Sequence, residues 1–283
     1  MRRTVGATLL VMAVAITPPA AAAGDHDFAG TVPGIAGKTW TDLLSQVFPD
    51  IAATADGYAE ASEMIDLRSI GAGDESWISC GDKIAFRDRD ARLIRLGSRD
   101  YFIVTLELED DCVGLLALFD DSGKLVDAVN VKGDQHISFS GNYLRPLGRD
   151  GALVIASLWH DNSSQSYDIT SLILARPQGL TSLGDVLALG SRECGDSDKR
   201  KPGQLVLEES KVHVVANGDA LARIELGVTR GIQKLDSEDC EAKIGREVHT
   251  NFDGYWRWNA KKRAYQAHIK ELDLLAKWNE NHL

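Results

Sequence analysis

Short apolar runs separated by turn-forming residues dominate this chain from about Trp77 to His268. The runs are rich in Val, Ile, Leu, Phe and Tyr, and clusters of Gly, Asp, Asn and Ser divide them. This pattern predicts antiparallel strands joined by turns, because branched and aromatic side chains fit a pleated surface whereas Gly, Asn and Asp fit turns. No regular alternation with long helices is visible, which argues against a parallel, doubly wound sheet. We therefore expect a mainly β fold, an antiparallel meander of many short strands.

The sequence leaves the arrangement of these strands open. A sandwich, a barrel and propeller-like blades are all compatible with it, since no repeat recurs at a fixed spacing. Residues 120–123 and 259–262 are each predicted to close a hairpin, while residues 205–209 and 212–216 read as two separate strands. Residues 113–118 are almost wholly apolar, as expected of a strand covered on both faces.

A short helix is expected near each terminus. Thr39 is a suitable N-cap for a helix whose apolar residues recur over positions 43–48, and Pro49 is expected to end it. Apolar residues at helical spacing over positions 269–276 predict an amphipathic helix at the other end of the chain.

Residues 1–23 predict an export signal. Arg2 and Arg3 precede an apolar run over residues 5–16, and three alanines at 21–23 offer a small-residue cleavage site before Gly24. The apolar run is about a dozen residues long, short of the roughly 20 that span a bilayer. No Cys stands at the cleavage site, so a lipid anchor is not expected. We expect a soluble mature protein that is periplasmic or secreted.

The remaining chain is expected to form one β-rich exported domain over residues 38–283. Residues 24–37 are rich in Gly, Ala and Pro and predict an extended leader. The polar segment 195–203, which contains Pro202, is the best candidate for a boundary inside the domain.

The net charge of the chain argues against a nucleic-acid partner. It is -11 at pH 7, and removal of Arg2 and Arg3 with the signal would make it -13. Binding to a phosphate backbone needs clustered Lys and Arg, and the basic triplet at 199–201 stands among acidic residues.

Four cysteines in the exported part predict two disulfides. They are Cys80, Cys112, Cys194 and Cys240. Acidic neighbours precede Cys112 and Cys194 and flank Cys240, which disfavours the thiolate that a nucleophile or metal ligand must present. Consecutive strands are usually neighbours, so we expect Cys80 to pair with Cys112 and Cys194 with Cys240.

The densest polar segment lies between two predicted strands and is the leading candidate for a binding loop. Its candidate contact residues are Trp159, His160, Asp161, Asn162, Gln165 and Tyr167, with His136 from another connection. Such a loop could hold a sugar, an amino acid or a peptide, with an aromatic ring for stacking. Asn, Asp and Ser equally serve a turn that bonds its own backbone, so a purely structural role stays open.

An enzymatic alternative uses His136, His160 and Asp161 in a metal-assisted hydrolase. No HxH, HExxH or paired CxxC spacing supports a metal site, and Ser157 lacks the GxSxG elbow of a hydrolase nucleophile. No cofactor and no metal is therefore expected.

An aromatic stretch near the C-terminus is the remaining candidate surface. Strand alternation places Trp256 and Trp258 on one face, and Tyr255 with Arg257 on the other. Tyr and Arg are enriched at interface hot spots, so Tyr255 and Arg257 are candidate partner-binding residues. Taken together, the sequence favours a non-catalytic exported protein that binds an unknown protein or small molecule, with the hydrolase as the alternative.

Overall fold

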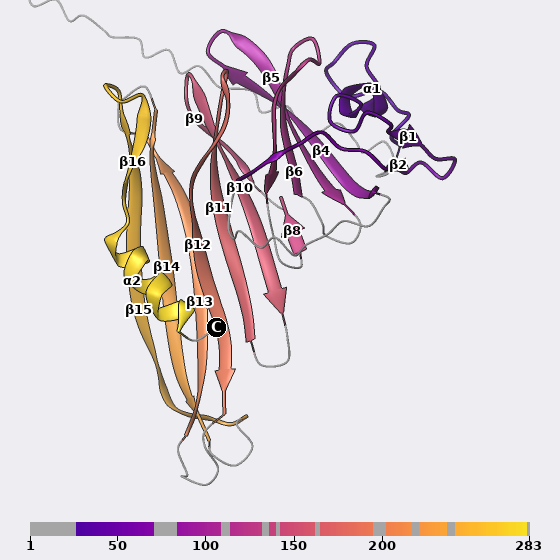
Figure 1. Ribbon diagram of the computed structural model, residues 1–283. Coiled ribbons are helices and arrows are strands. Elements are labelled where there is room, and N and C mark those ends of the chain that lie inside the picture. The colour runs from indigo at the N-terminus through magenta and orange to yellow at the C-terminus, as the bar shows by residue number, and fades with distance from the viewer. Residues whose placement is uncertain are drawn as a thin grey trace, which may run out of the picture.

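The computed structural model describes residues 27–70, 84–108, 114–131, 136–139, 142–161, 165–194, 202–216, 221–236 and 241–281. Their regular structure is almost entirely β, in two sheets, with one helix near each end of the described chain (Figure 1). The prediction of a mainly β protein is confirmed, and the architecture is sandwich-like. The predicted export signal and Cys80, Cys112 and Cys240 lie outside the described residues.

The N-terminal half forms a seven-stranded sheet in the order β1-β2-β4-β5-β6-β7-β3. Its strands are β1 (Ala52–Ala53), β2 (Ala59–Ala61), β3 (Arg68–Ile70), β4 (Ile84–Leu96), β5 (Arg99–Leu108), β6 (Gly114–Asp120) and β7 (Leu125–Val131). Neighbouring strands are antiparallel except β3 and β7, which pair in parallel.

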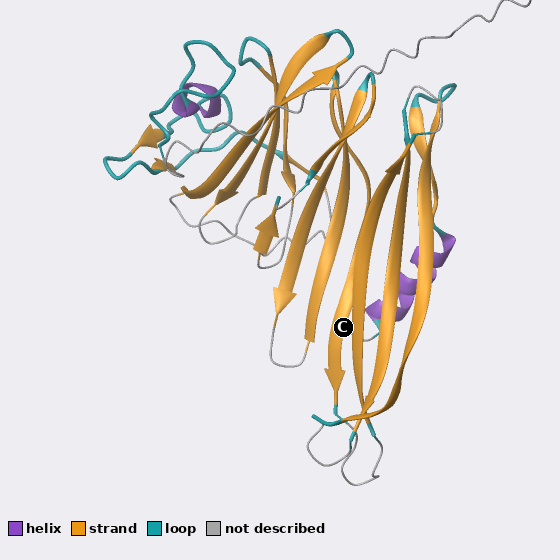
Figure 2. Ribbon diagram, turned by 180° about the vertical axis from the view of Figure 1, so that it is seen from behind, coloured by secondary structure: helices purple, strands orange, loops and turns teal. Residues whose placement is uncertain are grey.

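The C-terminal half forms a nine-stranded sheet in the order β16-β15-β14-β13-β12-β11-β10-β8, with β9 also paired to β10. Its strands are β8 (His136–Ser138), β9 (Leu144–Gly148), β10 (Gly151–Asp161), β11 (Gln165–Arg176), β12 (Gly179–Glu193), β13 (Gly203–Val215), β14 (Arg223–Leu235), β15 (Lys243–Asn259) and β16 (Ala264–His268). Strands β12 to β15 extend well beyond the seven-stranded sheet (Figure 2).

Strand β13 is one continuous strand, where the apolar runs suggested two. Its central residues are polar, yet Ser210 and Lys211 pair with Val228 and Gly227 of β14, so the ladder continues without a turn. Backbone pairing thus overrides the local drop in hydropathy.

Both predicted hairpin turns are present. Asp120 closes the β6–β7 turn, since its Oδ1 accepts from the N–H groups of Ser122 at 3.0 Å and Lys124 at 2.9 Å. Gly123 adopts a φ of +77°, which other residues resist. Strand β6 is buried along almost its whole length, as its continuous apolar run predicts.

The two helices are α1 (Trp40–Leu44) and α2 (Lys270–Glu280). Thr39 caps α1 as expected, in a capping box with Asp42. The helix ends at Leu44 rather than at Pro49, and Val47 and Phe48 enter the core from the following turn. Burial of these two side chains, rather than continued helix, accounts for their apolar spacing.

Three hydrophobic clusters hold the layers together. The first lies under α1 on the outer face of the seven-stranded sheet, with Phe48 and Phe86 at its centre. The second fills the space between the two sheets. The third lies on the opposite face of β10 to β12 and is closed by β14, β15 and α2, with Trp256 as its largest side chain.

Residues 27–37, the described part of the leader expected over 24–37, pack into the first cluster. Phe28, Val32 and Ile35 are each at most 4 % exposed, and Thr31 forms a bridge with Thr39. Apolar residues among the glycines thus tie this segment to the core.

The strands that flank the polar segment at 195–203 are neighbours in one sheet. Glu193 at the end of β12 pairs with Gln204 of β13, so both flanking strands belong to the same sheet. The change from one sheet to the other falls between β7 and β8. Among the described residues, neither helix is long and apolar enough to cross a membrane.

Candidate functional site

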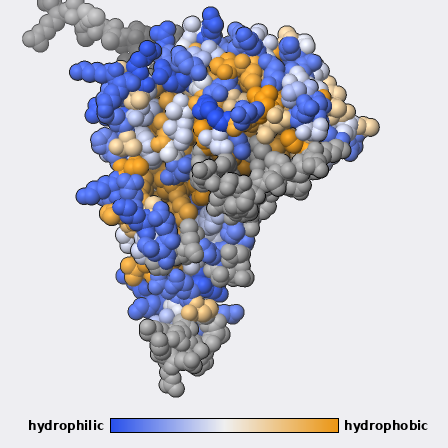
Figure 3. Space-filling view, viewed as in Figure 1, coloured by the Kyte–Doolittle hydropathy of each residue, from blue (hydrophilic) through white to orange (hydrophobic). Residues whose placement is uncertain are grey.

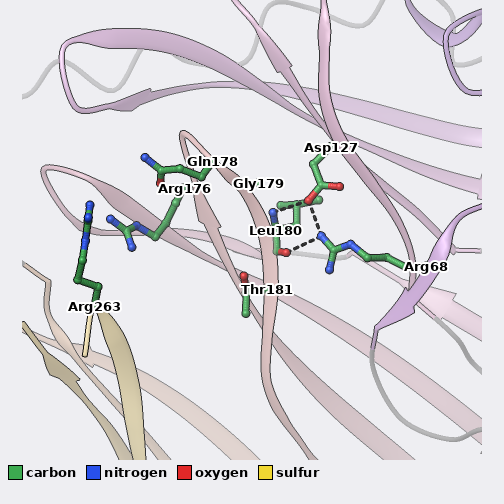
Figure 4. Close-up of a pocket in the computed structure, with 8 residues that line it drawn as sticks. All are labelled: Arg68, Asp127, Arg176, Gln178, Gly179, Leu180, Thr181 and Arg263. Atoms are coloured by element: carbon green, nitrogen blue, oxygen red, sulfur yellow. Dashed lines mark hydrogen bonds and ion pairs between the residues drawn. The ribbon is translucent and has the colours of Figure 1, made fainter. Parts of the chain in front are cut away.

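A cleft with a volume of about 520 Å³ opens beside the turn between β11 and β12, where the two sheets meet. Its polar lining side chains are Arg68, Asp127, Arg176, Gln178, Thr181 and Arg263 (Figure 4). They come from β3, β7, the β11–β12 hairpin and the β15–β16 turn, so only the folded chain assembles them.

Asp127 fixes one end of this cleft. Its carboxylate forms an ion pair with Arg68 and accepts a hydrogen bond of 2.7 Å from the Leu180 backbone N–H. Arg68 also donates to the Leu180 carbonyl at 2.6 Å. These bonds join the seven-stranded sheet to the nine-stranded sheet.

Gly179 makes this close approach feasible. Its φ is +132°, and a Cβ at this position would lie 2.5 Å from Asp127 Oδ2. A side chain here would therefore displace Asp127 as well as strain the backbone.

Arg176 lies toward the other end of the cleft, over the ring of Trp258. Its guanidinium carbon lies 5.0 Å from the ring centroid of Trp258, which in turn packs edge-on against Tyr265 at 5.5 Å. Burial raises the pKa of the Tyr265 phenol, which donates to the Ala222 carbonyl at 2.7 Å. Within the described chain, the Arg176 Nε is buried without a hydrogen-bond partner.

Arg263 reaches the cleft from the β15–β16 turn. It has a φ of +51°, the single positive value among the described non-glycine residues. Asn259 stabilises the turn by accepting from the Lys262 N–H at 3.0 Å and donating to Gln266 at 3.0 Å. In Figure 4 the Arg176 guanidinium points toward the Arg263 side of the cleft.

The cleft is basic although the chain is acidic. Three guanidinium groups and one carboxylate line it, and Asp127 neutralises only Arg68. Within the described residues, Arg176 and Arg263 form no ion pair with a carboxylate. Guanidinium groups present planar sets of N–H donors that match carboxylate and phosphate oxygens, so this arrangement is suited to binding an anion.

The predicted binding residues lie elsewhere, next to the connection between β10 and β11. Trp159 is 45 % exposed, and the rings of His160 and Tyr167 stack at 4.9 Å with an interplanar angle of 5°. Asp161 is exposed and Gln165 is half-buried. Asn162 lies outside the described residues.

The structure does not bring His136 into register with His160. The backbone of His136 pairs with Trp159 of β10, and His160 pairs with Tyr167 of β11. Among the described residues, no three His, Cys, Asp or Glu side chains converge as metal ligands.

Tyr255 and Arg257 lie on β15, which is separated from β10 by four intervening strands of the sheet. Tyr255 stacks on His268 at 4.6 Å and lines a groove of about 1010 Å³ between β13–β16 and the start of α2, while Arg257 is exposed. Trp256 is 1 % exposed, so the face opposite Tyr255 is core, as alternation predicts. These two residues and the β10–β11 loop are separate surfaces.

Arg68, Arg176 and Arg263 were not among the residues expected from the sequence to form a site. Arg68 and Arg176 have no basic neighbour in the sequence, Arg263 follows two lysines in a predicted turn, and no spacing links the three. Figure 3 shows hydrophilic side chains in several separate clusters on one face, with hydrophobic areas between them, so an exposed arginine does not by itself mark a site. Comparison with family models, curated proteins and solved structures gave no match, so the chemistry of the cleft carries the functional argument.

Proposed function

We propose that this chain is an exported, non-catalytic binding protein whose ligand is an anion held in the arginine cleft. The observation that supports the proposal is the excess of guanidinium groups over carboxylates in a cleft of a chain whose net charge is -11. Two uncompensated cations kept in one cleft repel each other, and a bound anion would remove that repulsion.

Binding fits the lining residues better than catalysis. Guanidinium groups donate hydrogen bonds but neither accept nor release protons at neutral pH. Asp127 is the one carboxylate among the described lining residues. It already forms an ion pair with Arg68 and accepts a hydrogen bond from the Leu180 N–H. None of these lining residues is His, Cys or Ser, the usual bases and nucleophiles. The alternative is a hydrolase that uses His136, His160 and Asp161. The strand register does not support it, because His136 pairs with Trp159 rather than with His160.

Export and two disulfides are part of the proposal. Residues 1–23 support export, and no free cysteine occurs in the part of the chain that the structure describes. Amino-terminal sequencing of protein recovered from outside the cytoplasm is expected to begin near Gly24, and an intact N-terminus there would contradict export.

A protein partner at the β10–β11 loop is a second candidate function. Exposed Trp159 beside the His160–Tyr167 stack favours it, because large exposed aromatics often anchor interfaces. Partners crosslinked to the full mature chain should be lost with Trp159→Ala and kept with Leu93→Ala, a similarly exposed apolar side chain on β4. Equal capture by both variants would contradict this role.

Isothermal titration of the mature chain with acetate, sulfate, phosphate and succinate tests the anion proposal. At least one anion should bind with 1:1 stoichiometry and weaken as salt rises. Arg176→Gln and Arg263→Gln should each weaken that binding. Arg246→Gln, at an exposed site on β15 outside the cleft, should leave it unchanged. No binding, or equal binding by all variants, would overturn the proposal.

A further inference from the structure

The cleft offers two free cationic groups rather than three. Arg68 is already committed, because it forms an ion pair with Asp127 and donates to the Leu180 carbonyl. Arg176 and Arg263 remain, and neither forms an ion pair or a hydrogen bond within the described residues. The charge available to a ligand is therefore that of two guanidinium groups.

Trp258 leaves the hydrogen-bonding edge of Arg176 available. The Arg176 guanidinium carbon lies over the Trp258 ring, and this contact uses none of the N–H groups in a hydrogen bond to an oxygen acceptor. The Arg176 Nε is buried without a partner in the described chain, so an acceptor placed beside it would satisfy a donor that is otherwise unbonded.

The remaining lining residues are uncharged, and two of them have polar side chains. Gln178 contributes an amide and Thr181 a hydroxyl, and both side chains are exposed. A volume of about 520 Å³ is in the range of small-ligand pockets, roughly 300–1,000 Å³, and has room for more than a single oxyanion. Amide and hydroxyl groups suit the hydroxyls of a polyol or sugar.

We propose that the ligand is a phosphomonoester of a small hydroxylated molecule, whose dianionic phosphate is shared between Arg176 and Arg263. This inference rests on the proposed function and adds its ligand class. A phosphomonoester carries close to two negative charges at pH 7 and matches both guanidinium groups. A monoanion leaves one of them uncompensated. The tetrahedral oxygens can accept from two guanidinium forks at once.

A matched pair of ligands tests the charge requirement. Glucose 6-phosphate and glucose 6-sulfate share a sugar and a tetrahedral group but differ in charge at pH 7.5. In titration calorimetry of the mature chain, the phosphate is expected to bind about tenfold or more tightly than the sulfate. Arg176→Gln and Arg263→Gln should each reduce this ratio to near one, whereas Arg246→Gln should preserve it. The melting temperature of each variant checks folding.

Two further ligands identify what the cleft recognises. Inorganic phosphate should bind more weakly than glucose 6-phosphate, and equal affinity would overturn the role of the hydroxylated portion. Succinate should bind more weakly than glucose 6-phosphate, and equal affinity would overturn the preference for a tetrahedral group.

Equal affinity for glucose 6-phosphate and glucose 6-sulfate would overturn the inference of a dianionic ligand, while the proposal of anion binding would stand. Absence of binding by every anion would overturn the proposed function as well.

Discussion

Arg230 and Glu208 form an ion pair of 2.6 Å in which both side chains are buried, at 7 % and 0 % exposure. Glu208 also accepts from the Leu189 backbone N–H at 2.9 Å and from the Asn279 side chain at 2.8 Å. Arg230 lies 3.6 Å from the ring centroid of Trp278. The pair therefore connects β13 and β14 to β12 and α2.

This network lies at the point where β12 and β13 cease to pair with each other. Strands β12 and β13 pair only from Gly190 with Leu207 to Glu193 with Gln204. Leu187 precedes these positions in β12 and has no partner in β13. Its carbonyl accepts a hydrogen bond of 3.1 Å from Asn279 of α2 instead. Satisfied buried polar groups of this kind fix a single arrangement of the strands.

Glu208→Gln is expected to destabilise the protein by roughly 3–5 kcal/mol, because it leaves the Arg230 charge buried without a counter-ion. Urea unfolding of the mature chain, followed by tryptophan fluorescence, measures the change. Glu209→Gln is the control, since Glu209 pairs with Lys211 at the surface, where such pairs contribute about 0–1 kcal/mol. Similar losses in both variants would contradict a special role for the buried pair.

Gly254→Ala is expected to weaken the docking of α2 on β15. A Cβ at position 254 would lie 2.5 Å from Leu272 Cδ1 and 3.1 Å from Ile269 Cγ2. Overpacking of this kind costs about 1–3 kcal/mol. In a Leu272→Ala background the added methyl group has space, so its cost should fall. A double-mutant cycle by urea unfolding checks this, and additive losses would contradict the contact.

Acid should loosen the N-terminal segment through Asp50. The Asp50 carboxylate accepts from the Ser62 hydroxyl, from the Ser62 N–H at 2.9 Å and from the Glu63 N–H at 3.0 Å. These bonds, led by that of the Ser62 hydroxyl, lower the pKa of Asp50 below its usual value. The folded state thus holds the proton less tightly than the unfolded state.

The stabilisation by Asp50 is therefore present above the unfolded pKa of about 3.9 and lost as pH falls through the lower folded pKa. Asp50→Asn should make the free energy of unfolding less dependent on pH between about 5 and 2. Asp66→Asn, at an exposed residue, is the control. Identical pH profiles of the wild type and Asp50→Asn would contradict this assignment.

Non-reducing peptide mapping should find Cys80 joined to Cys112 and Cys194 joined to Cys240. Phe86 near the start of β4 pairs with Leu108 at the end of β5, so the segments that contain Cys80 and Cys112 leave the sheet at the same end. Cys194 follows Glu193, which pairs with Gln204 of β13. The adjacent Gly203 pairs with Leu235 at the end of β14, and Leu235 pairs with Lys243 at the start of β15, so the strand ends that flank Cys240 lie at the same end of the sheet as Cys194. Each bridge should contribute about 2–5 kcal/mol. A peptide joining Cys112 to Cys194 would contradict this pairing.

The sequence by itself determined the mainly β class, both hairpin turns, the buried strand β6 and the cap of α1 at Thr39. These features depend on residues within a few positions of one another, where alternation, turn chemistry and capping act directly. The tertiary structure alone decided the parallel pairing of β3 with β7, the packing of residues 27–37 and the cleft. Arg68, Arg176 and Arg263 stand far apart in the chain, and only the meeting of two sheets and one turn brings their charges together.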